Sequence, residues 1–193
     1  MSEKYEITNI QHPEWRFLRR IRALRDIPRY GVEAGDLGGW VEKEYNLSQD
    51  GNAWVGEQAT AFENSLVDED SAVLGRACVG GKVVTSGNAL IGGDVSLSGV
   101  EQFGWDDDVR SGEEFMFVEV AASKMFRAAL CRTKRGHRLH VGCWRGTVPK
   151  FRTMIESDRW VEATPKEIKL RRPELIAFTA MCEARIATWE PRT

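Results

Sequence analysis

The sequence predicts a β-rich α+β protein with a β-solenoid in its middle, an N-terminal cap, and a C-terminal β-hairpin followed by two helices. Three observations support this. Residues 51–98 repeat every six positions, the apolar pattern after residue 114 changes from strand-like to helical, and the charge changes sign along the chain. At 193 residues the chain has room for one ordinary domain or two small ones.

The first element, residues 1–50, has two interpretations. Phe17, Leu18, Ile21 and Leu24 recur at helical spacing among several arginines. A basic amphipathic helix of this kind would suit a membrane surface or a nucleic acid. The alternative is a strand that caps the exposed end of the solenoid, with the glycines between residues 31 and 39 in its turns.

Residues 51–98 form eight hexads without a break. The third and fifth positions mostly hold small or aliphatic side chains, the second is always polar, and the first is glycine in five hexads. Positions three and five are two residues apart, so both face inward on one strand and position four faces outward. Gly followed by Asn or Asp suits a bend with positive φ. Such coils bury their core only by stacking on one another.

The steps Val55–Ala59, Val67–Ser71 and Val73–Ala77 place a small residue four positions after an aliphatic one. In this they resemble the hexapeptide-repeat left-handed β-helices. The resemblance implies a left-handed path with three hexads per triangular coil, so eight hexads give a little under three coils. Periodicity does not determine handedness, and a β-meander or a right-handed solenoid is the alternative.

Three stretches also resemble a family of phage and prophage proteins of unassigned function. They are RIRALRDI at 20–27, AGDLGGWVEKEYNLSQDGNAWV at 34–55 and HVGCWRGTVPKF at 140–151. In that family an N-terminal cap leads into a variable number of hexads and then a small α/β unit. The resemblance favours the cap for residues 1–50 and implies a phage or prophage origin. It implies no activity.

After Ser98 the hexad pattern fails, and the acidic stretch 99–114 is expected to be a linker. The C-terminal domain, 115–193, begins with strand-like runs, and the alternation on both sides of a TKRG turn predicts a hairpin. Symmetric pairing about this turn places Cys131 near Leu139 and keeps Cys131 and Cys143 apart.

Two helices are expected after the hairpin. Thr147 can serve as the N-cap of the first. The second begins near Pro173, and an apolar stripe from Leu175 to Trp189 indicates a face that packs in the core.

The charge distribution supports two units with different surfaces. Residues 1–50 carry a net charge of −1, residues 51–114 carry −9 and residues 115–193 carry +8, which sum to −2. No run approaches the roughly 18 apolar residues that span a bilayer. The N-terminal residues lack a secretory signal, and the four cysteines form no CxxC pair. We therefore expect a cytoplasmic protein of the host cell, without a membrane partner and with free thiols.

The sequence offers little catalytic chemistry, and we predict no catalytic residue, cofactor or metal. His137 and His140 differ by three, so on a strand they point to opposite faces, which disfavours a metal site with Cys143. Many hexapeptide-repeat proteins are acyltransferases that use an acyl-coenzyme A donor and a histidine base beside the β-helix. Residues 41–114 contain no histidine, so this enzyme remains an alternative only.

A basic cluster around the predicted hairpin is a candidate binding site, with Trp144 available for stacking. Phosphate contacts require such a patch, which makes nucleic-acid binding a second alternative. Solvated charges, or contacts to an acidic protein surface, are the simpler interpretation. The cluster comprises Arg127, Arg132, Lys134, Arg135, His137, Arg138 and Arg145.

Apolar residues at outward hexad positions predict a homo-oligomer, most simply a trimer, in which unlike sides of the solenoid pair around a three-fold axis. Our leading hypothesis is a non-enzymatic oligomeric scaffold that acts by binding, with a host protein as a candidate partner. The candidate interface residues are Trp54, Phe62, Leu66, Leu74, Val84 and Leu90.

Overall fold

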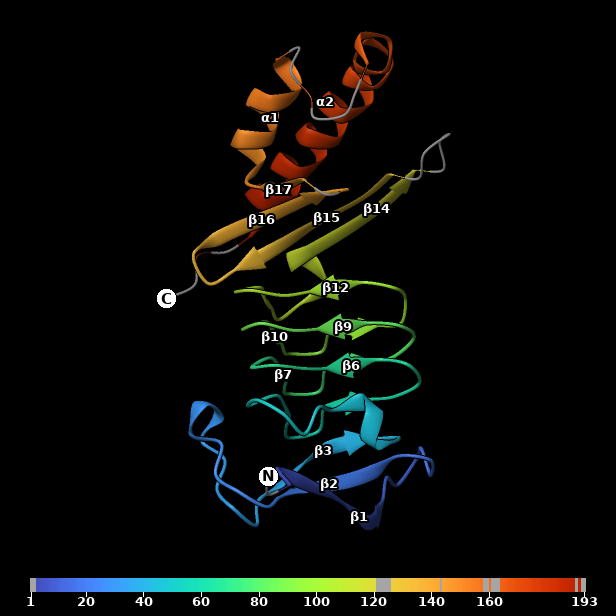
Figure 1. Ribbon diagram of the computed structural model, residues 1–193, viewed down its shortest axis with the longest axis vertical. Helices are drawn as coiled ribbons and strands as arrows, with labels where there is room; N and C mark the ends of the chain where they lie inside the picture. Colours follow the sequence, from blue (N-terminus) through green and yellow to red (C-terminus); the bar gives the residue numbers. More distant parts are fainter. Residues whose placement is uncertain are drawn as a thin grey trace. The chain divides into compact units, whose positions relative to one another are not determined.

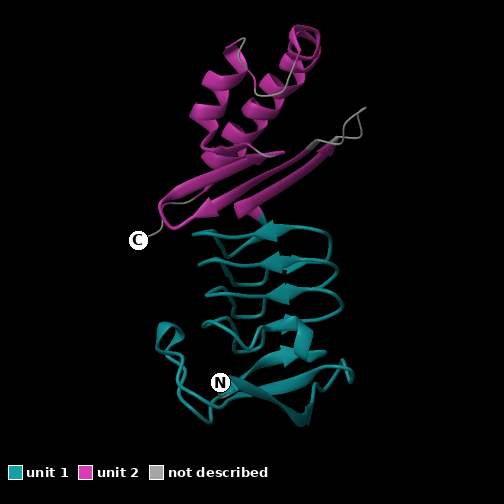
Figure 2. Ribbon diagram, in the orientation of Figure 1, with its two compact units in different colours: residues 1–112 teal, residues 113–193 magenta. Residues whose placement is uncertain are grey.

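A computed structural model describes residues 3–120, 126–142, 144–157, 160, 164–189 and 191. The chain divides into two compact units, Met1–Gly112 and Glu113–Thr193 (Figure 2). We call them the solenoid unit and the C-terminal unit and describe each by itself.

The solenoid unit begins with the antiparallel strands β1 (Tyr5–Gln11), β2 (Arg19–Ala23) and β3 (Leu37–Val41). The strand interpretation of the cap is thus confirmed over the amphipathic helix. The expectation that all the glycines lie in turns is wrong for Gly38 and Gly39, which lie inside β3. A Cβ atom at Gly38 would lie 2.5 Å from the Trp54 ring, so glycine lets that ring pack on the strand.

The eight predicted hexads form eight two-residue strands, and each pairs in parallel with the strand eighteen residues away (Figure 1). The strands are β4 (Trp54–Val55), β5 (Thr60–Ala61), β6 (Leu66–Val67), β7 (Ala72–Val73), β8 (Cys78–Val79), β9 (Val84–Thr85), β10 (Leu90–Ile91) and β11 (Ser96–Leu97). The strands of successive turns form three sheets, in the orders β1-β2-β3-β5-β8-β11, β4-β7-β10-β13 and β6-β9-β12. The β-solenoid is confirmed.

The side-chain register of the hexads is also confirmed. The third-position residues from Ala53 to Val95 are at most 1% exposed, and the fifth-position residues from Val55 to Leu97 at most 3%. The bends begin with a left-handed residue in every hexad. Where that residue is glycine, as at Gly51 and Gly75, φ lies near +60°; Glu57, Glu63 and Glu69 adopt the same conformation.

The solenoid is longer than the sequence pattern suggests. Strands β12 (Gln102–Phe103) and β13 (Asp108–Val109) pair in parallel with β9 and β10, so residues 99–112 do not form a linker. With β3 as an earlier strand, the solenoid has about four turns rather than a little under three. Phe103 and Val109 keep the fifth position apolar and buried. Glu101 and Asp107 break the third-position pattern, but their carboxylates accept backbone N–H bonds from Gly99 and Gly104 at 2.9 and 3.0 Å.

The C-terminal unit contains an antiparallel sheet in the order β14 (Phe115–Val120), β15 (Phe126–Thr133), β16 (Gly136–Val141) and β17 (Trp144–Gly146). The predicted hairpin is confirmed, although its register differs by one residue. Thr133 pairs with Gly136 across a two-residue turn, which places Leu130 opposite Leu139 and Cys131 opposite Arg138. Cys143 lies outside the described residues.

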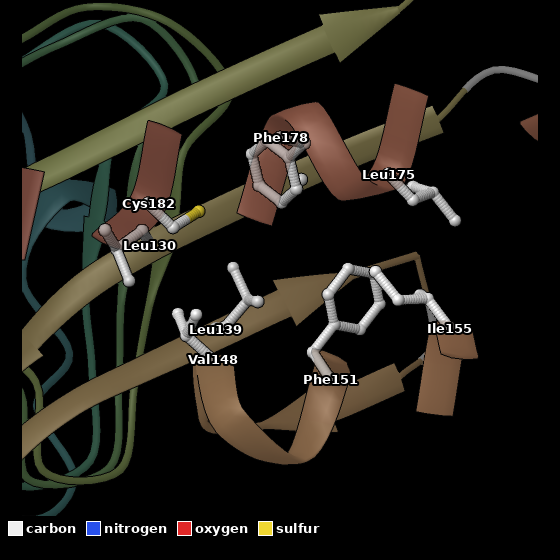
Figure 3. Packing of buried hydrophobic residues seen from close by; sticks show 9 residues of the cluster. Leu130, Leu139, Val148, Phe151, Ile155, Leu175, Phe178 and Cys182 are labelled. Atoms are coloured by element: carbon white, nitrogen blue, oxygen red, sulfur yellow. The ribbon is translucent and has the colours of Figure 1, made fainter. Parts of the chain in front are cut away.

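Helices α1 (Val148–Glu156) and α2 (Pro165–Ala187) pack against β15 and β16 (Figure 3). Their shared core consists mainly of Leu130, Leu139, Val148, Phe151, Ile155, Leu175, Phe178 and Cys182. The apolar stripe of α2 is confirmed, but its expected start near Pro173 is wrong. The helix starts at Pro165, because Thr164 and Glu167 form a capping box, and Pro173 is accommodated inside it.

Candidate functional site

The predicted basic cluster is divided between the two faces of the C-terminal sheet. Residues directly opposite on neighbouring strands share a face. Arg132 is opposite His137, on the face with Leu130 and Leu139 that the helices cover. Arg138 is opposite Cys131 and Arg145 is opposite His140, so both lie on the other face, as Arg127 does by alternation. Lys134 and Arg135 form the turn. The predicted cluster therefore consists of three separate groups of residues, two on opposite sheet faces and one in the turn, rather than one patch.

The structure brings part of the cluster together around a pocket of about 290 Å³, which we call the hairpin pocket. One wall is the end of the β15–β16 hairpin and the other is the end of α2 and the residues after it. The lining residues are Arg132, Thr133, Lys134, Gly136, His137, Ile186, Trp189 and Pro191.

Glu113 and Glu114 hold two side chains of the hairpin pocket, Trp189 and Arg132, in place. The Arg132 guanidinium lies 2.7 Å from the Glu114 carboxylate, and both side chains are only 11% exposed. The same guanidinium lies over the Trp189 ring at 5.8 Å from its centroid. The Trp189 indole N–H donates to the Glu113 carbonyl oxygen at 2.8 Å. Arg132 is thus held in place with its charge compensated, whereas the exposed Lys134 has no ion pair among the described residues.

Sequence reasoning missed the roles of Glu113, Glu114 and Trp189. The sequence predicts a linker for the acidic stretch that contains both glutamates, and it assigns Trp189 only to an apolar stripe that packs in the core. No local spacing connects residue 114 to residue 132 or residue 113 to residue 189. The buried ion pair depends on the antiparallel pairing of β14 with β15.

His137, in the wall of the hairpin pocket, caps the N-terminus of α1. Its Nε2 atom accepts a hydrogen bond from the Val148 backbone N–H, at the start of α1, at 2.9 Å. Thr147 occupies the predicted N-cap position but makes no side-chain cap bond, so His137 supplies the acceptor instead. Burial lowers the pKa of His137, which favours the neutral ring that this bond requires.

His140 lies on the opposite sheet face from His137. Burial, together with the nearby charges of Arg138 and Arg145, lowers the pKa of His140 to about 4. Among the described residues no group of three His, Cys, Asp or Glu side chains lies close enough to hold a metal ion. Cys78 and Cys182 are free thiols.

The candidate oligomer residues have different environments. Trp54 is 2% exposed because it packs within its own chain, so its side chain does not lie on the surface. Phe62 contacts Trp15 and Phe17 at ring-centroid distances of 6.0 and 6.1 Å. The others, Leu66, Leu74, Val84 and Leu90, are half-buried on the solenoid. The trimer itself stays a prediction.

One histidine does lie beside the solenoid. The His12 ring is 4.7 Å from the Trp40 ring, at the first coil. Its Nδ1 atom, however, accepts the backbone N–H groups of Glu14 and Trp15 at 3.2 and 3.1 Å. A neutral His12 therefore carries its proton on Nε2 and has no free lone pair to act as a general base.

No family model matches the chain. A curated relative, the uncharacterized acetyltransferase YdcK of Escherichia coli (strain K12), is 36% identical over 67 residues. The match covers 34% of this chain and 20% of YdcK, so the chain spans about a fifth of that relative. Phage origin has no support in these comparisons and stays a prediction. No described helix is long and apolar enough to cross a membrane.

Proposed function

We propose that this protein is a non-enzymatic binding protein, with the β-solenoid as a rigid scaffold and the C-terminal unit as the part that holds an anionic group of a partner. The observation that carries the proposal is the hairpin pocket. Lys134 lies there beside the apolar surfaces of Ile186 and Trp189, and Arg132 is fixed in the wall. A cation next to apolar surface suits a partner that presents a carboxylate or phosphate on an apolar or planar group.

An acidic protein segment is the partner that we favour over a nucleic acid. Arg127, Arg138 and Arg145 lie on the other sheet face from the pocket, so the cations do not form the single basic surface that a phosphate backbone would track. A host protein would fit the phage origin implied by the sequence resemblance, and both remain proposals.

A binding experiment with paired lysine variants tests this function. A fluorescent oligoglutamate peptide is titrated with the full chain at low salt, and its anisotropy is measured. We expect Lys134→Glu to weaken binding by about tenfold, because it replaces the uncompensated cation of the pocket. Lys150→Glu is the matched control, since Lys150 is an exposed lysine on α1 outside the pocket and changes the net charge equally.

Equal weakening by the two variants would mean that binding follows net charge and not the hairpin pocket. A labelled oligothymidylate provides the second arm. If it binds more tightly than oligoglutamate, and Lys134→Glu abolishes that binding, the nucleic-acid alternative is correct.

Acetyl transfer is the second candidate function, and the similarity to YdcK favours it. The hexads contain no histidine, and His12 uses Nδ1 within its own loop, so neither supplies a histidine base. Thermal unfolding with acetyl-coenzyme A tests this candidate. A bound donor at about 100 times its Kd adds roughly 2.7 kcal/mol of stability, and we expect no shift.

A further inference from the structure

The loop between β1 and β2 is a rigid element of the solenoid unit. Its ends are joined by a hydrogen bond from the His12 N–H to the Leu18 carbonyl oxygen at 3.1 Å. The Leu18 N–H donates in turn to the Trp15 carbonyl oxygen at 2.8 Å. The two backbone bonds to the His12 ring add to this frame. The loop therefore presents its side chains in a fixed arrangement.

Two large aromatic side chains on this loop are exposed. Trp15 is 40% exposed and Phe17 is 52% exposed, although both rings contact Phe62. His12 stacks on Trp15 at 5.6 Å and supports it from within the loop. We call Trp15, Phe17 and Phe62 the aromatic surface. Exposed apolar clusters on rigid loops are typical of contact sites.

Opposite charges flank Trp15 in the chain. Glu14 precedes it and Arg16 follows it, and both side chains are exposed. Neither makes an ion pair with any residue that the structure describes. The loop therefore carries one uncompensated carboxylate and one uncompensated guanidinium, one on each side of the tryptophan in the sequence.

We propose that the aromatic surface binds a second copy of this chain in a two-fold contact centred on Trp15. In a two-fold contact, residue i of one copy meets residue j of the other, and j meets i. Two loops running in opposite directions would therefore pair Glu14 with Arg16 twice while their Trp15 rings are buried together. Trp and Arg are the residues that contribute most at such contacts. A nucleic acid would match the aromatic rings and Arg16 but would leave Glu14 without an opposite charge, whereas a second copy supplies a partner to both.

Charge-swap variants test this contact by sedimentation. We expect the wild type, at high micromolar concentration, to have twice the mass of the Trp15→Ala variant. Glu14→Arg alone and Arg16→Glu alone each place like charges together and should remain at the mass of Trp15→Ala. An equimolar mixture of these two single variants should double in mass, because each supplies the charge that the other lacks. The double variant Glu14→Arg/Arg16→Glu should associate like the wild type.

Three outcomes overturn the proposal. They are a wild type that matches Trp15→Ala at every concentration, single variants that associate as well as the wild type, or a mixture that does not associate. The contact uses none of the solenoid residues Leu66, Leu74, Val84 and Leu90, so a trimer formed by them would persist in all variants. Binding at the hairpin pocket is also expected to persist in Trp15→Ala, so this proposal can fail without the proposed function failing.

Discussion

The first residue of each solenoid bend adopts a left-handed conformation, and its side chain decides how the bend is stabilised. At Gly87 and Gly93 a side chain would collide with the backbone of the neighbouring coil. Glu63 and Glu69 accept the strain of positive φ. Their carboxylates accept backbone N–H bonds from Gly81 and Gly87 in the next coil, which offsets part of that strain.

Alanine substitutions can separate two reasons for glycine at a position with positive φ: the backbone conformation itself and the lack of space for a Cβ atom. Gly31 has φ near +65°, and a Cβ atom there would meet nothing within 4 Å. Gly93 has φ near +61°, and its Cβ atom would overlap the Arg110 carbonyl oxygen. We expect Gly31→Ala to cost about 1 kcal/mol of unfolding free energy and Gly93→Ala more than about 3 kcal/mol, measured by urea unfolding. Similar costs for the two would show that the coils can separate to admit a methyl group.

At the scale of the elements, the two-residue strands depend on which side chain points inward. Val73 is fully buried, whereas its neighbour Leu74 is half-buried at a bend. We expect Val73→Asp to unfold the solenoid, because a buried unpaired carboxylate is costly. Leu74→Asp should leave it folded with a smaller loss of stability. Far-UV circular dichroism and urea unfolding measure both, and equal tolerance would contradict the register.

The elements also show how far the sequence could be interpreted. The hexads are predictable because four of their six positions keep the same kind of residue. The third and fifth positions face inward and are small or aliphatic, and the first and second positions hold the glycine and polar residues that suit a bend. The last two strands are not predicted because Glu101 and Asp107 replace small residues at the third position, and the local backbone bond that each carboxylate accepts is not visible in a hydrophobic pattern. The predicted start of α2 is too late because a proline typically marks the first turn of a helix, whereas Pro173 lies inside this one. The hairpin pocket depends on contacts between residues more than fifty positions apart, so spacing alone could not show it.

At the scale of the whole molecule, each of the two units contains buried or half-buried titratable groups. Those of the solenoid unit change charge in the alkaline range and those of the C-terminal unit in the acid range. In the solenoid unit Lys4 is 1% exposed, and burial lowers its pKa to about 8 from 10.5. In the C-terminal unit burial lowers the pKa of His137, and burial with two neighbouring arginines lowers that of His140 to about 4 from 6.5. Between the folded and unfolded pKa of each of these groups, the group binds more protons in the unfolded chain than in the folded chain, so its contribution to stability rises with pH.

Calorimetry from pH 4 to 9.5 should therefore resolve two responses. The C-terminal unit should lose stability as pH falls from about 6.5 towards 4, by about 1 kcal/mol after discounting for the partial exposure of both histidines. His137→Gln/His140→Gln should remove this slope. The solenoid unit should gain about 1 kcal/mol between pH 8 and 9.5, and Lys4→Met should abolish the gain. At higher pH the gain is opposed, because burial raises the pKa of Tyr5 and Tyr30 and the unfolded chain then loses their protons first. A histidine variant with an unchanged acid slope would assign the effect to carboxylates.

Paired strands of the solenoid are always eighteen residues apart, so every turn consists of three hexads and adds the same length. Deleting or duplicating three whole hexads keeps every strand above its partner and changes the length by about 4.8 Å, the spacing between paired strands. Deleting a single hexad would instead move each later strand to the next face and set Gly93 above the wrong bend. Evolution can therefore lengthen or shorten this molecule by copying whole turns, while the loop at Trp15 and the hairpin pocket, which lie outside the repeated turns, keep their own structure.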